Sequence, residues 1–93
     1  MKRKHFSYWP LMPEPGTFRH LKLEQLLNDE RLVLVEPPQT RKEKRLFNFV
    51  QWCAAAGWSL SKQGLGTDNH LLNLWELRLV GVPDHMRAYI LNY

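Results

Sequence analysis

The clearest periodic pattern in the sequence lies between residues 41 and 56, where apolar residues recur at the spacing of an α-helix. Thr40 and Glu43 have the T-x-x-E spacing of a capping box, in which each side chain accepts a hydrogen bond from the other residue's backbone N–H. Gly57 is suited to the left-handed conformation that ends a helix. The pattern therefore predicts a helix from Arg41 to Ala56. Its apolar face is expected to hold Leu46, Phe47, Phe49, Val50, Cys53 and Ala54.

Three segments in the rest of the core have the patterns of β-strands. Residues 32–35 form a continuous apolar run, which is typical of a strand covered on both faces, so we expect a central strand there. Residues 58–63 and 71–79 flank the turn-rich stretch 64–69, which predicts a hairpin. From Trp75 to Leu79 apolar and polar residues alternate, as in a strand with one wet face. A helix over the same residues is the alternative, and the hairpin connection favours the strand.

Two shorter helices and an N-terminal strand complete the expected elements. Thr17 is a capping residue for a helix that runs to about Asp29, and Asp84 is one for a short final helix. The alternation over His5–Trp9 predicts a short strand, and the prolines that follow enforce a loop up to residue 16.

These elements give an α+β fold in the order β-α-β-α-β-β-α, with the sheet packed against the helix at 41–56. A chain of 93 residues fits one domain. We therefore expect a single domain over residues 1–93, with the N-terminal strand and proline-rich loop over 1–16 and the α+β core over 17–93.

Composition indicates whether the chain is folded and which cellular compartment it suits. A hydrophobic fraction of 44% and a charged fraction of 24% are a globular balance and argue against disorder. Cys53 is the single cysteine, so no disulfide can form within the chain, and this favours the reducing cytosol for so small a domain. The basic start, Met1–Lys4, is not followed by the apolar run of a signal peptide, and no stretch approaches the ~20 apolar residues of a membrane span. We expect a cytoplasmic protein without membrane contact.

The polar face of the helix at 41–56 is the strongest functional feature. The formal net charge is +4, and residues 1–46 carry ten Lys and Arg against six Asp and Glu, whereas residues 47–93 carry three of each. Basic side chains in a first helical turn meet the positive end of the helix dipole, which is mildly unfavourable. The candidate binding residues, for protein or nucleic acid, are Arg41, Lys44, Arg45, Asn48 and Trp52.

Trp52 is the residue of this face that is hardest to place, because a large aromatic side chain is not expected among polar ones. Three interpretations stay open. A loop or the N-terminal strand covers Trp52; or it is a subunit contact, since Trp and Arg are favoured at the centres of interfaces; or it stacks on a base while Arg41, Lys44 and Arg45 hold phosphates.

No motif in the sequence names a reaction. The four histidines have no zinc-ligand spacing and a lone cysteine cannot make a cysteine-rich site, so we expect neither a metal nor another cofactor. The stretch Gly64-Leu65-Gly66 lacks the further spacing and the lysine of a phosphate-binding loop. Because no pair of acid, base or nucleophile can be argued from spacing, binding is favoured over catalysis.

The second half of the chain also shows a recognisable order of features. These are a helix ending at Ala56-Gly57-Trp58, a strand to Gln63-Gly64, then His70, and Val82-Pro83-Asp84-His85 before a final helix. In outline this order resembles the HicA-like toxin ribonucleases. The resemblance implies RNA cleavage served by His70. The usual Gly-Ser-His of that family is replaced here by Thr-Asp-Asn-His, and residues 70–82 are short for its two further strands.

Three functional hypotheses follow. The first is a small non-enzymatic regulatory or accessory protein that acts through protein–protein contact, as a homodimer, because eleven Phe, Trp and Tyr are many for one small core. The alternative is a nucleic-acid-binding module that uses the basic face of the helix at 41–56, including a winged-helix arrangement with 64–69 as the wing. The minor alternative is the HicA-like ribonuclease. Salt dependence separates the first two, because phosphate binding weakens steeply as salt rises.

Overall fold

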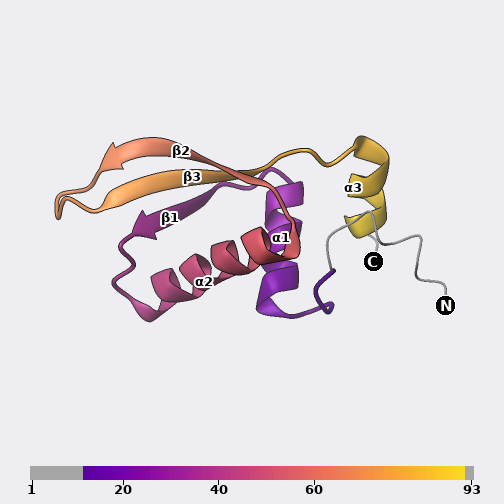
Figure 1. The fold of residues 1–93 in the computed structure, drawn as a ribbon, viewed down its shortest axis with the longest axis horizontal. Helices are drawn as coiled ribbons and strands as arrows, with labels where there is room; N and C mark the ends of the chain where they lie inside the picture. The colour runs from indigo at the N-terminus through magenta and orange to yellow at the C-terminus, as the bar shows by residue number, and fades with distance from the viewer. Residues whose placement is uncertain (1–11, 92–93) are drawn as a thin grey trace.

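The computed structural model describes residues 12–91, and its fold is α+β (Figure 1). The elements are α1 (Phe18–Leu27), β1 (Leu32–Glu36), α2 (Arg41–Ala56), β2 (Leu60–Thr67), β3 (Asn73–Leu79) and α3 (Asp84–Leu91). Their order confirms the predicted order from the first helix onward, and residues 73–79 form a strand as the hairpin connection favoured. The strand expected at His5–Trp9 lies outside the described residues.

The helix ends follow the local signals. At the start of α2, Thr40 Oγ1 accepts a hydrogen bond from Glu43 N at 3.1 Å, and Glu43 Oε1 accepts one from Thr40 N at 3.1 Å. Gly57 ends the helix with φ of 92°, in the left-handed region that glycine enters without a steric penalty. Thr17 caps α1 by accepting a hydrogen bond from His20 N. Asp84 is the first residue of α3, one position later than a cap.

The three strands form an antiparallel sheet in the order β1-β3-β2. Among residues 12–91, β1 lies at an edge of the sheet and β3 pairs on both sides, so the prediction of a central strand at residues 32–35 is wrong for the described sheet. Leu34 is 1% exposed on the face that packs against the helices, while Val33 and Val35 are half-buried on the opposite face. The run is apolar throughout because the side chains on both of its faces are at least half-buried. The central position belongs to β3, because β3 pairs with both other strands.

The β2–β3 hairpin is longer than the sequence indicated. Strand pairing continues to Thr67↔Asn73, because a bulge between Gly64 and Gly66 absorbs one residue, and Gly66 takes φ of 103° there. Most of the stretch expected as a loop, 64–69, is thus strand. The connection itself is closed by Asp68, whose Oδ1 accepts hydrogen bonds from two backbone N–H groups that follow it. α2 directly precedes this hairpin, as the winged-helix interpretation requires.

Helices α1 and α2 cover one face of the sheet, and α3 lies beyond its end (Figure 1). The buried core consists of Leu23, Leu26, Leu27, Leu34, Phe49, Cys53, Trp58 and Leu77. Phe49 and Leu34 are buried as expected, whereas Val50 is half-buried and Ala54 is exposed. A hydrogen bond from Arg87 Nη1 to the carbonyl oxygen of Leu27 ties α3 to the end of α1.

Candidate functional site

Four of the predicted binding residues project from α2 into solvent. Arg41, Lys44, Arg45 and Asn48 are all exposed. The neighbouring carboxylate of Glu43 accepts hydrogen bonds from Gln39 N at 2.7 Å and from Thr40 N, so it is engaged in capping the helix. The one carboxylate in the first turn of α2 is therefore bonded to backbone N–H groups, and the cations beside it are exposed.

Trp52 does not lie on the exposed face of α2, where the sequence analysis placed it. It is half-buried, packs against the core, and stacks on Phe49 with ring centroids 6.2 Å apart. The guanidinium carbon of Arg19, from α1, lies 4.9 Å from the centroid of its ring. Placing Trp52 outside the apolar face of α2 was therefore wrong. The covered stripe is rotated toward α1, so that it includes Trp52 and leaves Ala54 in solvent.

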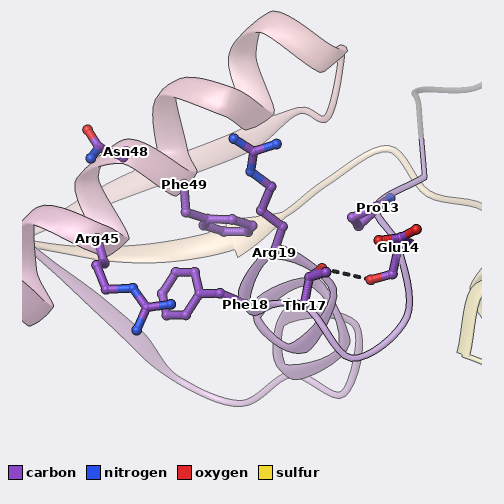
Figure 2. A pocket seen from close by; sticks show the side chains of 8 residues that line it. All are labelled: Pro13, Glu14, Thr17, Phe18, Arg19, Arg45, Asn48 and Phe49. Carbon is purple, nitrogen blue, oxygen red and sulfur yellow. Dashed lines mark hydrogen bonds between the residues drawn. The ribbon is translucent and has the colours of Figure 1, made fainter.

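A groove of about 490 Å³ lies on the surface where the start of α1 meets the middle of α2 (Figure 2). Phe49 lies at its centre, with Phe18 and the Arg45 side chain on one side and Arg19 on the other (Figure 2). The groove lining consists of Pro13, Glu14, Thr17, Phe18, Arg19, Arg45, Asn48 and Phe49. Of the predicted residues it brings together Arg45 and Asn48, and it does not include Arg41 or Lys44.

Cations lie over the aromatic rings around this groove. The guanidinium carbon of Arg45 is 4.1 Å from the centroid of the Phe18 ring, and Lys22 Nζ is 5.3 Å from the same centroid. Phe18 meets Phe49 edge to face, with centroids 6.4 Å apart and planes at 88°. Each cation–ring contact is worth about 0.5–1 kcal/mol at an exposed site. Arg19 and Arg45 therefore each have an aromatic ring beneath the guanidinium carbon at the border of the groove.

The groove carries a net positive charge. The two ion pairs among the described residues, Arg31–Glu76 and Lys62–Glu36, both involve the sheet and lie away from it. Within residues 12–91 no carboxylate forms an ion pair with Arg19 or Arg45. Glu14 is the acidic residue of the lining, and its backbone carbonyl accepts a hydrogen bond from Thr17 Oγ1 at 2.7 Å. Two guanidinium groups therefore face one exposed carboxylate.

Sequence reasoning missed Phe18, Arg19 and Glu14 as members of the site. One signal was available, because Phe18 falls outside the stripe of Leu23, Leu26 and Leu27 on its own helix. An aromatic residue off the apolar face of a helix often contacts something other than that helix's main packing surface. Nothing in the pattern indicated that α2 would supply that contact.

Cys53 is fully buried, and burial raises the pKa of its thiol from 9.0 to about 12, although the positive charge of Arg19 acts in the opposite direction. A thiol in this setting stays protonated near neutral pH. Because the thiolate is the reactive form, Cys53 behaves as a small apolar side chain rather than as a nucleophile.

The raised pKa makes stability depend on pH. In the unfolded chain the Cys53 thiol ionises near pH 9, whereas in the folded chain it stays neutral up to about 12, so its contribution is complete below pH 9 and is lost as pH rises from 9 to 12. Urea unfolding at about pH 8 and about pH 10.5 should show a smaller loss of stability in Cys53→Ala than in the wild type. Equal losses in both proteins would contradict this linkage.

His70 lies in the hairpin connection and is exposed, and its backbone N–H donates to Asp68 Oδ1. It is therefore a polar residue at the hairpin end, whereas the HicA-like resemblance places the histidine on a strand. Among the described residues that follow this turn, β3 is the one strand, so the family's two further strands are not both present there. Across the described part of the chain, no three His, Cys, Asp or Glu side chains gather in a way that could hold a metal ion.

Comparisons of the chain with protein-family models, with curated proteins and with solved structures give no match. Among the described residues no helix has the length and apolar character to cross a bilayer. The groove and the charges around it are therefore the features of the described residues that bear on function.

Proposed function

We propose that the protein binds nucleic acid through a basic surface, defined as Arg41, Lys42, Lys44 and Arg45 of α2 together with Arg19 of α1. The observation that carries this proposal is the concentration of four exposed cations in the first five residues of a helix. Like charges there repel one another and meet the positive end of the helix dipole, which is mildly unfavourable for the fold. A polyanion would stabilise all of them at once.

The geometry supports phosphate contacts over a purely structural use of these side chains. The side chains are exposed, and among the described residues none of the five forms an ion pair with a carboxylate. Phosphate contacts from Lys and Arg supply most of the affinity of nucleic-acid binding and do not depend on sequence.

The test is a charge reversal with a control of equal net charge. The double variant Arg41→Glu/Lys44→Glu should lower the affinity for all oligonucleotides, on the order of tenfold or more at low salt. It should also reduce the slope of log K against log salt by about two, because each lost phosphate contact removes roughly 0.9. Neither residue lines the groove or belongs to the core, so thermal unfolding should change little.

The matched control is Arg31→Glu/Arg78→Glu. Each double variant removes four units of positive charge, so the formal net charge falls from +4 to zero in both. Arg78 is exposed on the sheet face opposite α2, and Arg31 pairs with Glu76 on that face. Full binding by the control and weak binding by Arg41→Glu/Lys44→Glu are expected. Equal loss in the two proteins would mean that net charge alone attracts the nucleic acid, and would remove the assignment to α2.

Self-association as a homodimer is a second candidate, favoured by the sheet face that the helices leave uncovered. On this face Val33, Val35 and Leu74 are half-buried and adjoin one another through the β1–β3 pairing. β1 also has no strand paired on its outer side within the described residues, and a free edge can pair with another chain. Trp52 offers a partner less surface than the sequence indicated, since Phe49 and Arg19 cover part of it.

Sedimentation equilibrium tests this second candidate directly. We expect a dimer at micromolar concentration, and Val33→Lys should shift the protein toward the monomer, because it replaces a half-buried apolar side chain of the uncovered face with a charged one. A monomer at every concentration examined would exclude the dimer without affecting the proposal for nucleic acid.

A further inference from the structure

We propose that the protein self-associates through the outer edge of β1, which pairs antiparallel with β1 of a second copy and joins the two three-stranded sheets into one. This inference rests on the second candidate of the proposed function, the homodimer, and assigns its interface to one edge and one register. The pairing centres on Leu34, so that Val33 of one copy lies opposite Val35 of the other.

The two edge strands of the described sheet differ in how well they resist the addition of another strand (Figure 1). β2 carries an exposed lysine, Lys62, and a bulge between Gly64 and Gly66, and both features hinder edge pairing. β1 pairs with β3 without a bulge, and it contains neither lysine nor proline. β1 is therefore the edge that offers a regular row of backbone N–H and C=O groups to another chain.

The uncovered face of the sheet becomes more apolar toward the same edge. On β2 this face carries Ser61 and Gln63, on β3 it carries Leu74 with two charged residues, and on β1 it carries Val33 and Val35. The two valines are half-buried in the single chain. In an antiparallel pair, opposite residues have their Cβ atoms about 4.5–5.5 Å apart, so the valines of the two copies contact each other. The apolar part of the face then lies at the centre of the joined sheet.

The symmetry of such a pair limits the possible registers. A twofold axis perpendicular to the sheet makes the two edge strands antiparallel and keeps the helices of both copies on one side. Each residue then lies opposite one that points to the same face, so one residue at the axis lies opposite itself. Centring the pair on Leu34 places Leu32 opposite Glu36 and uses all five residues of β1, whereas any other centre leaves part of the strand unpaired.

Exposed charges beyond the two ends of β1 have opposite signs. Asp29 and Glu30 precede the strand, and the cations of α2, which begin at Arg41, follow it. Within residues 12–91 neither of the two acidic side chains forms an ion pair, whereas Arg31 and Glu36 pair with other strands of their own sheet. Antiparallel pairing brings the start of one β1 to the end of the other. The acidic segment of each copy therefore lies toward the cations of the other copy, which offsets the repulsion between two chains of net charge +4.

The first experiment tests the register with cysteines on the uncovered face. Val33→Cys and Val35→Cys are prepared separately, mixed, oxidised with glutathione disulfide and separated on a gel without reductant. A disulfide needs Cα atoms about 4.4–6.8 Å apart, and opposite residues of an antiparallel pair are about 4.5–5.5 Å apart. The mixture should form a covalent dimer, and each variant alone should form much less, because each residue lies opposite the other one.

Ser61→Cys is the matched control for cross-linking. Ser61 is also half-buried on the uncovered face, but it lies on the β2 edge, so this variant should give no covalent dimer. Two uncovered faces stacked on each other would be about 10 Å apart, which is too far for a disulfide. Cross-linking of position 33 with position 35 therefore identifies edge pairing. The native Cys53 is fully buried and is the same in every variant.

The second experiment exchanges exposed charges and leaves the strand unaltered. Glu30→Lys should raise the Kd of the dimer on the order of tenfold at low salt, because it replaces attraction by repulsion at two symmetric places. Lys42→Glu should have a similar effect, and Glu30→Lys/Lys42→Glu should restore the dimer, because opposite charges meet again. A double variant no tighter than the single ones would overturn the charge complementarity.

Glu14→Lys is the matched control for the charge exchange, because Glu14 is exposed before the start of α1 whereas Glu30 follows its end. It adds the same charge as Glu30→Lys, and its Kd should stay within about twofold of the wild type, since exposed charges far from the interface are screened. Sedimentation equilibrium measures each Kd, and thermal unfolding verifies that each variant keeps the fold.

The outcomes separate this inference from the proposal on which it rests. A wild type that is a monomer at every concentration overturns both the homodimer and its interface. A dimer whose mixture of Val33→Cys and Val35→Cys does not cross-link overturns the β1 edge alone, and a covalent dimer of Ser61→Cys would place the interface on β2. Cross-linking of Val33→Cys alone that equals that of the mixture would overturn the register about Leu34. The test of nucleic-acid binding with Arg41→Glu/Lys44→Glu is independent of these results.

Discussion

Phe49→Ala is expected to lower the free energy of unfolding by about 3–5 kcal/mol, the cost of deleting a buried phenylalanine and leaving a cavity. Phe49 is 2% exposed and contacts Phe18 and Trp52, so its removal opens the junction of α1 and α2. For a domain of this size that loss is a large part of the roughly 5–15 kcal/mol that folded proteins typically have. Urea unfolding followed by circular dichroism measures it.

Phe47→Ala provides the comparison for this prediction. Phe47 is on the same helix and is half-buried, so its truncation removes less packing and should cost clearly less than that of Phe49. Equal stability of Phe49→Ala and the wild type would mean that the assigned buried face of α2 is incorrect. Equal losses in the two variants would mean that both edges of the helix are equally packed.

Leu77→Ala is expected to cost about 2–5 kcal/mol, because Leu77 is 2% exposed in the central strand and packs beneath the helices. Leu74 is in the same strand with its side chain on the opposite, half-buried face, so Leu74→Ala should cost less. The pair tests whether both helices cover one face of the sheet. A larger loss of stability from Leu74→Ala than from Leu77→Ala would mean that the main core lies on the sheet face opposite the helices.

The helix ends and the hairpin could be predicted from the sequence because they depend on neighbouring residues. The capping box of Thr40 and Glu43 and the left-handed Gly57 involve hydrogen bonds and backbone angles within a few positions. The hairpin depended on two apolar stretches joined by a short polar one. Its true length was missed, because the bulge at Gly66 continues the pairing through residues with a loop-like composition.

The order of the strands could not be predicted from the same local patterns. The apolar run of β1 has the composition of a central strand, yet β3 takes that place because it pairs with β2 through the hairpin and with β1 through a distant contact. Hydrophobicity reports how much of a strand is covered. It does not report which neighbours form its hydrogen bonds, since every strand offers the same backbone groups.

The candidate site shows the same division between local sequence and tertiary structure. The sequence alone determined that α2 begins with a cluster of cations and that it has one apolar stripe, because helical periodicity follows from residue spacing. Only the tertiary structure decided which edge of that stripe is covered. α1 packs beside Phe49, so Trp52 faces Arg19 and the groove gains Phe18 and Arg19 from a segment more than twenty residues away. The physical reason is that a helix surface has two edges of similar hydrophobicity, and a contact distant in the sequence selects between them.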